Sequence, residues 1–317
     1  MTDANGGVVK YKNIESLVVG SYTYTEDTSA QTYYNASEKA VYLYIAAGDN
    51  GGNLSSSHSA FSAMMGNCNN LTIKGSSGFD SINLNLPRGP GDCINPVIGG
   101  LLTIKMGDGN DTLNSAKLAN GDSVDMGAGD DTVSVMANGS PQTLSNINLT
   151  KLDGGAGTDT LKFEESGSNT TALTLTTGGA TNFENLIGTA GAETLTGDAN
   201  ANVLSGLGGA DTLYGLGGDD TLYAGKYAGI GMENCGTGNS ASKLYGGAGD
   251  DTLCGDSGEN TLDGGTGTDT LSGGNGVDTF VIRSGDGSTT LADADVVTDF
   301  QDGTDVIGLD GIAFDDL

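Results

Sequence analysis

From Gly188 onward, glycine and acidic residues recur in one nine-residue register. Repeats such as GLGGADTLY and GLGGDDTLY begin at residues 188, 197, 206 and 215, and again at 246, 255, 264 and 273. The sixth position of each repeat holds a carboxylate or an amide: Glu193, Asn202, Asp211, Asp220, Asp251, Asn260, Asp269 and Asp278. Carboxylate and carbonyl oxygens are the ligands that a hard cation such as Ca²⁺ prefers. The array therefore predicts repeated calcium sites.

The other positions of the repeat predict short strands joined by tight turns. Glycines at positions 1 and 4 allow positive φ and let the backbone carbonyls turn inward. Position 8 is apolar in every copy, from Leu195 to Phe280, and predicts a strand residue that faces a core. Thr, Ser and Tyr at positions 7 and 9 suit a solvated strand face. One isolated copy would be an ordinary turn, but eight copies in one register favour the calcium interpretation.

The charge of the chain also favours a divalent cation as a partner. The 317 residues include 41 Asp and Glu against 12 Lys and Arg, which gives a formal net charge of −29. Such a charge opposes compaction unless cations neutralise it, and it repels nucleic acid and anionic membranes. No apolar run approaches the roughly 18 residues that a membrane span needs. We therefore expect neither nucleic-acid binding nor membrane insertion.

Similar turns occur before residue 188 without a fixed spacing. GSSGFDSIN, GDGNDTLN, GAGDDTVS and GGAGTDTLK supply four further candidate calcium ligands: Asp80, Asp111, Asp131 and Asp159. Between these turns, alternating stretches such as AVYLYIAA, NLTIKG and LLTIKM predict β-strands. Convincing helix signals are nearly absent, so the expected fold class is all-β.

Composition divides the chain near residue 187. Seven of the 11 tyrosines lie in the first 44 residues, whereas the regular nonapeptides fill the second part. We expect a calcium-binding, β-rich module of sandwich or solenoid type over residues 1–187. A roll of nonapeptides follows over 188–317, with an insertion at 224–245 and a C-terminal cap from about 282.

The four cysteines form two local pairs, Cys68 with Cys93 and Cys235 with Cys254. The absence of C-x-x-C spacing argues against a thiolate zinc site. Two disulfides are expected if the protein works in an oxidising compartment, and buried free thiols are the alternative. A bond from Cys235 to Cys254 would attach the 224–245 insertion to the roll.

The nonapeptide array resembles the calcium-binding repeats of RTX proteins. The resemblance implies a parallel β-roll in which two nonapeptides form one coil and Ca²⁺ lies between turns of neighbouring coils. It implies one edge with Glu193, Asp211, Asp251 and Asp269, and a second with Asn202, Asp220, Asn260 and Asp278. Weaker or altered sites are expected around Asn202 and Asn260, because an amide replaces the carboxylate. In this arrangement Asp211→Ala should destabilise the array more than Asp198→Ala does.

The stretch DADVVTDFQDGTDVIGLDGIAF, which begins at residue 293, resembles the closing cap of secreted RTX proteins. Such proteins usually continue from the cap into an uncleaved C-terminal secretion signal, and we expect the natural chain to do the same. The resemblance implies export through a type I channel as a largely unfolded chain. It also implies folding outside the cell, where Ca²⁺ is abundant, and a cell-surface location.

The first 187 residues lack a recognisable catalytic set. The single histidine, His58, lies in the loop SSSHSAF, and the zinc-protease motif H-E-x-x-H is absent. Carboxylate pairs of the glycosidase kind are too numerous to choose among. We expect no enzymatic activity.

Two groups of residues in the first module are candidates for ligand binding. Tyr22, Tyr24, Tyr42 and Tyr44 either pack on strand faces or form a contact platform. The second group is Asp108, Asn110, Asp111, Asp130 and Asp131. Its DGND and AGDD turns resemble those of the calcium-dependent peptide-binding modules of large Gram-negative RTX adhesins. The resemblance implies a bound Ca²⁺ that accepts the terminal carboxylate of a peptide.

Three functions are compatible with these features. The favoured one is calcium-dependent adhesion, for example in a biofilm, as part of a larger adhesin that binds a peptide terminus or a glycan on a host or neighbouring microbial cell. A second is the accessory region of a secreted polysaccharide-active enzyme, and a third is a structural surface-layer segment.

Overall fold

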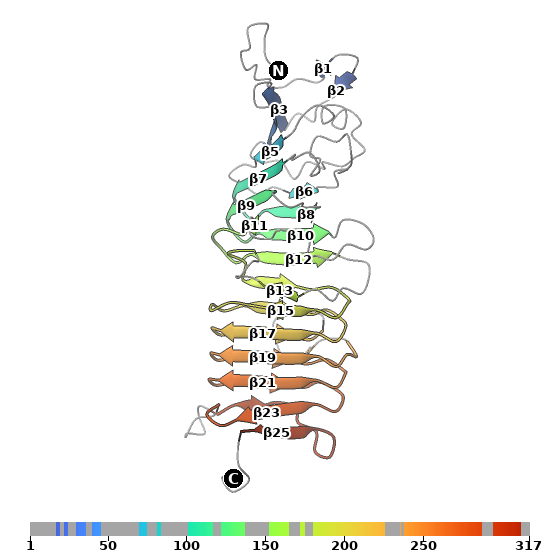
Figure 1. Ribbon diagram of the computed structural model, residues 1–317, viewed down its shortest axis with the longest axis vertical. Helices are drawn as coiled ribbons and strands as arrows, with labels where there is room; N and C mark the ends of the chain where they lie inside the picture. Colours follow the sequence, from blue (N-terminus) through green and yellow to red (C-terminus); the bar gives the residue numbers. More distant parts are fainter. Residues whose placement is uncertain are drawn as a thin grey trace. The chain divides into compact units, whose positions relative to one another are not determined.

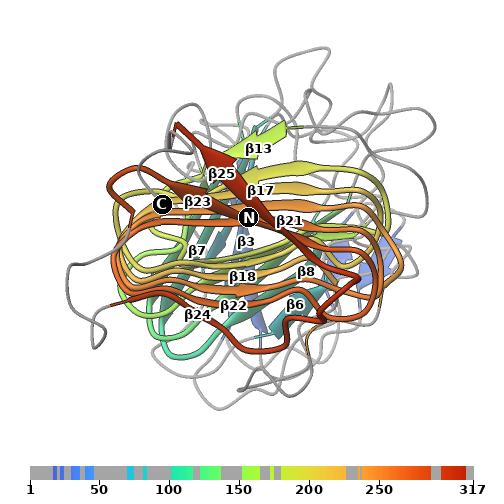
Figure 2. The same ribbon diagram turned by 90° about the horizontal axis from the view of Figure 1, so that it is seen from below.

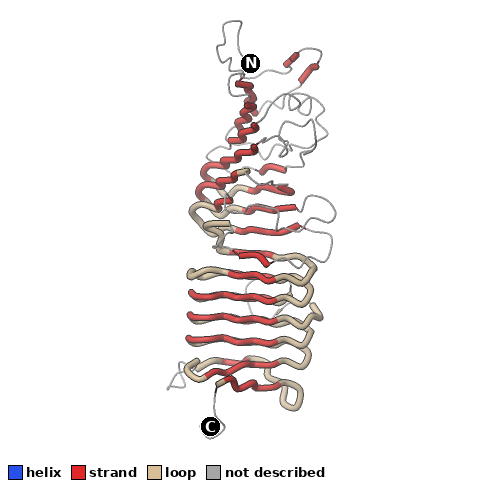
Figure 3. The backbone as a smooth tube through the Cα atoms, in the orientation of Figure 1, coloured by secondary structure: helices blue, strands red, loops and turns tan. Residues whose placement is uncertain are grey.

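The computed structural model of the chain describes the strands at 17–19, 22–24, 30–35, 40–45, 70–74 and 81–83, and residues 101–116, 122–136, 152–164, 172–174, 180–225, 235, 238–286 and 294–311. Every regular element in these ranges is a β-strand, as the tube in Figure 3 shows. The described residues contain no helix long and apolar enough to cross a membrane. The predicted all-β class with parallel sheets is confirmed.

The chain divides into two compact units. The first contains residues 1–161 and 180–183, and the second contains residues 162–179 and 184–317. The division falls within strand β12 (Thr160–Glu164). The boundary near residue 187, which rests on composition, stays a prediction.

The first unit contains a largely parallel sheet in the order β11-β9-β7-β5-β4-β3, in which only β3 and β4 pair antiparallel. In a second sheet β6, β8 and β10 lie side by side and parallel, and β1 pairs antiparallel with β2. The bounds are β1 (Leu17–Val19), β2 (Tyr22–Tyr24), β3 (Ala30–Asn35), β4 (Ala40–Ile45), β5 (Asn70–Lys74), β6 (Ser81–Asn83), β7 (Leu101–Asp108), β8 (Thr112–Ala116), β9 (Ser123–Ala128), β10 (Thr132–Met136) and β11 (Leu152–Asp153).

Alternating apolar residues of these strands form the core of the first unit. Ile104 on β7 pairs in register with Val124 on β9, and both side chains are at most 2 % exposed. Met106 and Met126 follow two residues later on the same buried face. Because the side chains of a strand alternate between faces, this pattern puts Lys105 and Asp125 outside, where they form an ion pair.

The second unit is a roll of two parallel sheets, whose layers are visible end on in Figure 2. One sheet contains β14, β16, β18, β20, β22 and β24. The other contains β13, β15, β17, β19, β21, β23 and β25, whose stack Figure 1 shows. The bounds are β13 (Ala172–Thr174), β14 (Asn185–Ile187), β15 (Thr194–Thr196), β16 (Val203–Ser205), β17 (Thr212–Gly217), β18 (Thr221–Tyr223), β19 (Lys243–Ala248), β20 (Thr252–Cys254), β21 (Thr261–Thr266), β22 (Thr270–Ser272), β23 (Thr279–Arg283), β24 (Val296–Val297) and β25 (Val306–Asp310).

Position 8 of the nonapeptide forms the core of the roll. Successive strands alternate between the sheets, so two nonapeptides complete one coil, and equivalent leucines stack in register as Leu213 with Leu244 and Leu222 with Leu253. These leucines are fully buried. Each contributes about 1.5–3 kcal/mol of transfer free energy on burial. The predicted parallel β-roll is confirmed.

The structure corrects the extent of the 224–245 insertion. Residues 243–245 begin β19, which pairs with β17 on one side and β21 on the other. The sequence TGNSASKLY at 237–245 is therefore a further nonapeptide, with Ser242 at position 6. It escapes a pattern search because it has neither the glycine at position 1 nor the acidic residue at position 6. This extra half coil shifts all later turns to the opposite edge of the roll.

Candidate metal sites

The turns of the second unit carry position-6 residues in two columns. The turns that lead into β16, β18, β20, β22 and β24 form what we call the Asp220 edge, with Asn202, Asp220, Asp251, Asp269 and Asp295. The turns that lead into β15, β17, β19, β21, β23 and β25 form the Asp211 edge, with Glu193, Asp211, Ser242, Asn260, Asp278 and Asp305. The expected grouping of Asp211 with Asp251 and Asp269, and of Asp220 with Asn260 and Asp278, is wrong because of the extra repeat.

One oxygen of each position-6 carboxylate joins neighbouring coils along the Asp220 edge. The backbone N–H of Asp220 donates to Asp251 Oδ1 at 2.7 Å, and the N–H of Asp251 donates to Asp269 Oδ1 at 2.8 Å. The N–H of Asp269 donates to Asp295 Oδ1 at 3.0 Å. The carboxylates are therefore held in a fixed orientation by the chain itself.

The second oxygen of these carboxylates has a different environment. Within the described residues, the buried Oδ2 atom accepts no hydrogen bond in Asp131, Asp211, Asp220, Asp251, Asp269 and Asp278. Each of these residues is at most 1 % exposed to solvent. A buried carboxylate oxygen without a donor is costly, and a bound cation would offset that cost.

The glycine at position 1 leaves room beside this oxygen. A Cβ added at Gly215 would lie 2.2 Å from Asp220 Oδ2 and 2.6 Å from the carbonyl oxygen of Gly246. A Cβ added at Gly246 would lie 2.3 Å from Asp251 Oδ2 and 2.4 Å from the carbonyl oxygen of Gly264. A carboxylate of one coil and a carbonyl of the next thus face one small space above each glycine.

This geometry refines the expected role of the glycines. Positive φ occurs at position 4, as in Gly218 and Gly249, and at position 2, where even Leu216 has a φ of 84°. Gly215 and Gly246 at position 1 do not have positive φ. Position 1 therefore needs glycine for the space that a side chain would fill, and positions 2 and 4 are the ones that use positive φ.

The donor set fits Ca²⁺. In the described part of the chain, no three His, Cys, Asp or Glu side chains gather into a cluster that could hold a metal ion. The oxygens that face one another are instead one carboxylate and main-chain carbonyls from adjacent turns, for example Asp220 Oδ2 and the Gly246 carbonyl. Ca²⁺ accepts such mixed oxygen sets with 6–8 ligands in flexible geometry. Asp220, Asp251 and Asp269 would hold the ion, which would supply the positive charge that this edge lacks.

Gly215→Ala should weaken this arrangement. Its methyl group would occupy the space between Asp220 Oδ2 and the Gly246 carbonyl. We expect a loss of about 1–3 kcal/mol of stability in Ca²⁺, in the range of other overpacking changes, together with weaker calcium binding. Calcium titration followed by thermal unfolding measures both. Gly217→Ala is the matched control, because its Cβ would have only ordinary contacts at 3.7 Å. Equal effects of the two substitutions would contradict the assignment.

Burial changes the acidity of the same groups. It raises the pKa of Asp211, Asp220 and Asp251 from 3.8 to about 7, and neighbouring carboxylates add to the shift. It raises the pKa of Asp131, Asp269 and Asp278 to about 6. In the absence of a cation, the folded chain therefore binds protons that the unfolded chain has already released.

The calcium-free chain should accordingly gain structure on acidification. Because the folded pKa values lie above the unfolded value of 3.8, the stabilisation is complete below about pH 4 and is lost as pH rises through 6 to 7. We expect the strand signal in circular dichroism, recorded in EDTA, to increase between about pH 8 and pH 5. In Ca²⁺ the same acidification should weaken binding, since protons compete for the carboxylates. A calcium-free signal that falls on acidification would contradict the burial of these groups.

The turns of the first unit have the same carboxylate ladder. The N–H of Asp111 donates to Asp131 Oδ1 at 2.6 Å, and the N–H of Asp131 donates to Asp159 Oδ1 at 2.7 Å. All three residues are buried. Asp80, the fourth candidate of this unit, lies outside the described residues.

The candidate ligand group of the first unit is split between the interior and the surface. Asp111 and Asp131 are buried, whereas Asp108, Asn110 and Asp130 are exposed. Asn110 Oδ1 accepts the N–H of Asp130 at 3.0 Å, so the two neighbouring turns meet at these residues. Asp130 Oδ1 in turn accepts the N–H of Thr158 at 3.0 Å. The exposed residues form a row on adjacent turns.

The tyrosine and cysteine candidates are only partly described. Tyr22 and Tyr24 belong to β2, and Tyr42 and Tyr44 belong to β4, but their side chains lie outside the described part of the structure. Cys68 and Cys93 also lie outside it. Cys235 and Cys254 form a disulfide, with their Cα atoms 5.1 Å apart.

Sequence reasoning missed three position-6 residues: Ser242, Asp295 and Asp305. The N–H of Asp269 donates to Asp295, and that of Asp278 donates to Asp305 Oδ1 at 3.1 Å, so the cap continues both columns. The sequence does contain a signal for the two cap residues. Asp295 is followed by Val-Val and Asp305 by Val-Ile, which matches an acidic position 6 followed by the strand residues at positions 7 and 8. The glycine-poor turns of the cap concealed the register.

The nonapeptide part of the chain matches a known family model, the RTX calcium-binding nonapeptide repeat. Four copies match, at residues 187–225, 237–262, 245–280 and 255–288. The second match begins at 237, which agrees with the additional repeat that contains Ser242. A comparison with curated proteins finds no match to the chain. Repeats of this type bind Ca²⁺ and are typical of proteins secreted through the type I route.

Proposed function

Because residues 187–288 carry RTX calcium-binding repeats, we propose that this chain is a calcium-dependent extracellular adhesion segment without enzymatic activity. Several Ca²⁺ ions close and stiffen the roll after type I export. The first unit then binds a surface ligand of a host or neighbouring cell, with a peptide C-terminus favoured over a glycan. The chain acts as part of a larger, surface-associated adhesin.

The buried carboxylate oxygens of the roll that accept no hydrogen bond support the calcium part of the proposal. Among the described residues of the roll, five position-6 carboxylates keep Oδ2 free of hydrogen bonds: Asp211, Asp220, Asp251, Asp269 and Asp278. Outside the cell, Ca²⁺ at millimolar concentration can fill sites whose dissociation constants are about 10⁻⁴–10⁻³ M, as in other extracellular modules. Inside the cell the same carboxylates repel one another. Binding and folding are thereby coupled to the compartment.

The exposed row of polar residues on the first unit supports the ligand part. Asp108, Asn110 and Asp130 lie on adjacent turns directly beside the buried ladder of Asp111 and Asp131. A Ca²⁺ ion at such an edge with one open coordination position would accept a carboxylate from outside the protein. The terminal carboxylate of a peptide has this chemistry. Glycan hydroxyls would bind the same position less strongly, because they are uncharged.

An array of peptide C-termini and glycans tests the proposal. The 317-residue chain should bind in Ca²⁺ and not in EDTA, with amidation of the peptide terminus abolishing binding. Asp108→Asn with Asp130→Asn should reduce binding at least about tenfold, the usual cost of removing a charge-assisted contact. Asp219→Asn with Asp250→Asn is the matched control, because both residues are exposed turn acids of the second unit.

Other results would replace the proposal. Depolymerisation of alginate or a related polymer by the chain would favour an accessory region of a polysaccharide-active enzyme. Calcium-driven two-dimensional assembly without ligand binding would favour a structural surface-layer segment.

A further inference from the structure

The Asp211 edge lacks the carboxylate that a calcium site needs at two successive turns. Ser242 and Asn260 stand at position 6 there, between Asp211 and Asp278. A Cβ added at Gly206 would meet Asp211 Oδ2 at 2.2 Å, but one added at Gly255 would meet Asn260 Nδ2 at 3.0 Å. An N–H donor therefore replaces the carboxylate oxygen at this turn.

The amide of Asn260 bonds the groups around it. Its Nδ2 donates to the carbonyl of Gly258 at 3.1 Å and to Asp256 Oδ1 at 3.3 Å. Its Oδ1 accepts the N–H of Ser242 at 3.2 Å, which joins this coil to the preceding one. Amide hydrogens repel a cation and satisfy the same oxygens that a cation would attract. The residues at this turn do not fit Ca²⁺.

Asp256 completes the junction between the two turns. Its side chain is 2 % exposed, and its Oδ1 accepts the N–H of Gly258 at 2.7 Å. From the preceding coil, the N–H of Ser240 lies 3.3 Å from Oδ2. Hydrogen bonds to an ionised acceptor are about twice as strong as neutral ones. The carboxylate thus links turn 238–242 to turn 255–260 with protein donors alone.

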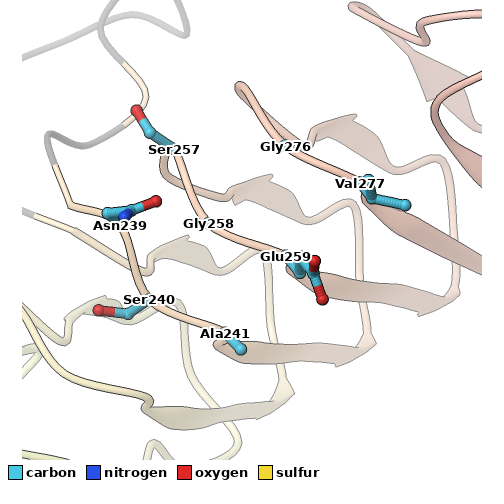
Figure 4. A pocket seen from close by; sticks show the side chains of 8 residues that line it. All are labelled: Asn239, Ser240, Ala241, Ser257, Gly258, Glu259, Gly276 and Val277. Carbon is cyan, nitrogen blue, oxygen red and sulfur yellow. The ribbon is translucent and has the colours of Figure 1, made fainter.

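The surface beside the junction also lacks converging acids. An open hollow of about 350 Å³ crosses three adjacent turns, as Figure 4 shows. Asn239, Ser240, Ser257 and Val277 are among its lining residues, and Glu259 is the one acidic residue in that lining. One exposed carboxylate does not make a calcium site.

A cation that belongs to the chain lies on the sheet that these turns lead into. Asp263 on β21 is 1 % exposed, and its carboxylate forms an ion pair with Nη1 of Arg283 on β23. Nε of Arg283 also bonds Asp310 on β25 at 3.1 Å. The guanidinium ties three successive strands together by supplying a positive charge that belongs to the chain.

We propose that turns 238–242 and 255–260 form a calcium-free junction. The Asn260 amide and the Asp256 carboxylate perform there the bridging that Ca²⁺ performs between turns elsewhere in the roll. The strands around this junction, β19, β20 and β21, keep their structure when calcium is removed. The Cys235–Cys254 disulfide, which ends on β20, reinforces the same region. The inference concerns folding and is independent of the adhesive function.

Asn202 differs from Asn260 and provides a comparison within the chain. At Gly197 the facing atom is Asn202 Oδ1, which a Cβ would approach to 2.2 Å. Asn202 presents an oxygen where Asn260 presents a nitrogen. The two asparagines look equivalent in the sequence, but only the turn at Asn202 presents an oxygen there, which also accepts the N–H of Asp198 at 2.7 Å.

Hydrogen–deuterium exchange of the full chain in EDTA tests the junction. We expect amides of 243–248, 252–254 and 261–266 to exchange at least about tenfold more slowly than those of 212–217, because the retained hydrogen bonds are worth about 1 kcal/mol or more each. Asp256→Ala should remove this difference. Asp198→Ala, at the equivalent position of the Asn202 repeat, should leave it unchanged. Uniform exchange across all coils in EDTA would overturn the proposal.

A second variant gives a result that does not depend on the folding of Asp256→Ala. Asn260→Asp restores a carboxylate at position 6, and native mass spectrometry in Ca²⁺ should then count one more ion per chain. In EDTA the amides of 243–248, 252–254 and 261–266 in this variant should exchange about tenfold faster, since an unpaired buried charge replaces a hydrogen-bonded amide. An unchanged ion count with unchanged protection would overturn the role of the Asn260 amide in excluding calcium.

Discussion

Asp251→Asn should destabilise the calcium-loaded chain and stabilise the calcium-free chain. Asp251 lies between Asp220 and Asp269 on the Asp220 edge and is 1 % exposed. Asparagine keeps the Oδ1 atom that accepts the N–H of Asp220, but it replaces Oδ2 with an NH₂ group and removes the negative charge. In Ca²⁺ that charge binds the ion. In EDTA it is a buried charge with like-charged neighbours, so its removal stabilises the calcium-free chain.

The size of the effect follows from ligand linkage. At about 10 mM Ca²⁺ and dissociation constants of about 10⁻⁴–10⁻³ M, one lost ion costs about 1.4–2.7 kcal/mol. For a unit of this size that corresponds to a fall of roughly 3–10 °C in Tm, measurable by circular dichroism. Asp250→Asn is the matched control, since the exposed Asp250 uses Oδ1 to accept the N–H of Thr268 at 2.8 Å. A shift of the same sign in Ca²⁺ and EDTA would contradict the role of Asp251.

Removal of calcium by EDTA near neutral pH should unfold most of the second unit. The chain carries a net charge of −29, and carboxylates recur on neighbouring coils, whose strands lie about 4.8 Å apart. Without cations, burial disfavours each charged carboxylate and its neighbours disfavour it further. We expect the strand signal in circular dichroism to fall strongly. The part that remains should come from strands β19–β21.

Two controls separate calcium ligation from simple charge screening. NaCl at matched ionic strength should restore little structure, because the buried Oδ2 atoms are not reached by screening from solvent. Mg²⁺ should restore less than Ca²⁺, since it demands octahedral geometry and gives up water reluctantly. A native spectrum in EDTA, or full recovery in NaCl, would show that the carboxylates do not need a bound ion.

The sequence predicted the roll because its information is local and repeated. A leucine two residues after an acidic residue, in a nine-residue period, specifies strand, turn and core face at once, and Leu213 and Leu222 lie where the pattern put them. The carboxylates of Asp111, Asp131 and Asp159 were also found without a fixed period, because each glycine-rich turn has the same local form. Local chemistry therefore identified most candidate ligands.

The residues that broke the pattern could not be placed in this way. Ser242 marks a repeat that has lost its glycine and its acidic residue, and it is recognised only from the pairing of Leu244 with Leu213 and Leu262. Without this repeat in the count, every later turn is assigned to the wrong edge of the roll. Asp295 and Asp305 were missed for a similar reason, since both turns lack the glycine at position 1 and only the second has one at position 4, Gly303.

The sequence alone determined that this chain is a glycine-turned, all-β roll with carboxylates in a calcium-binding repeat, because residue type and period suffice for that. Only the tertiary structure decided which carboxylates are neighbours, because partners on one edge come from different coils and one hidden half coil changes them all. It also distinguished Asn260 from Asn202. Which atom of an amide faces the space above a glycine depends on the donors and acceptors of the adjacent coil, here Ser242 and Asp256.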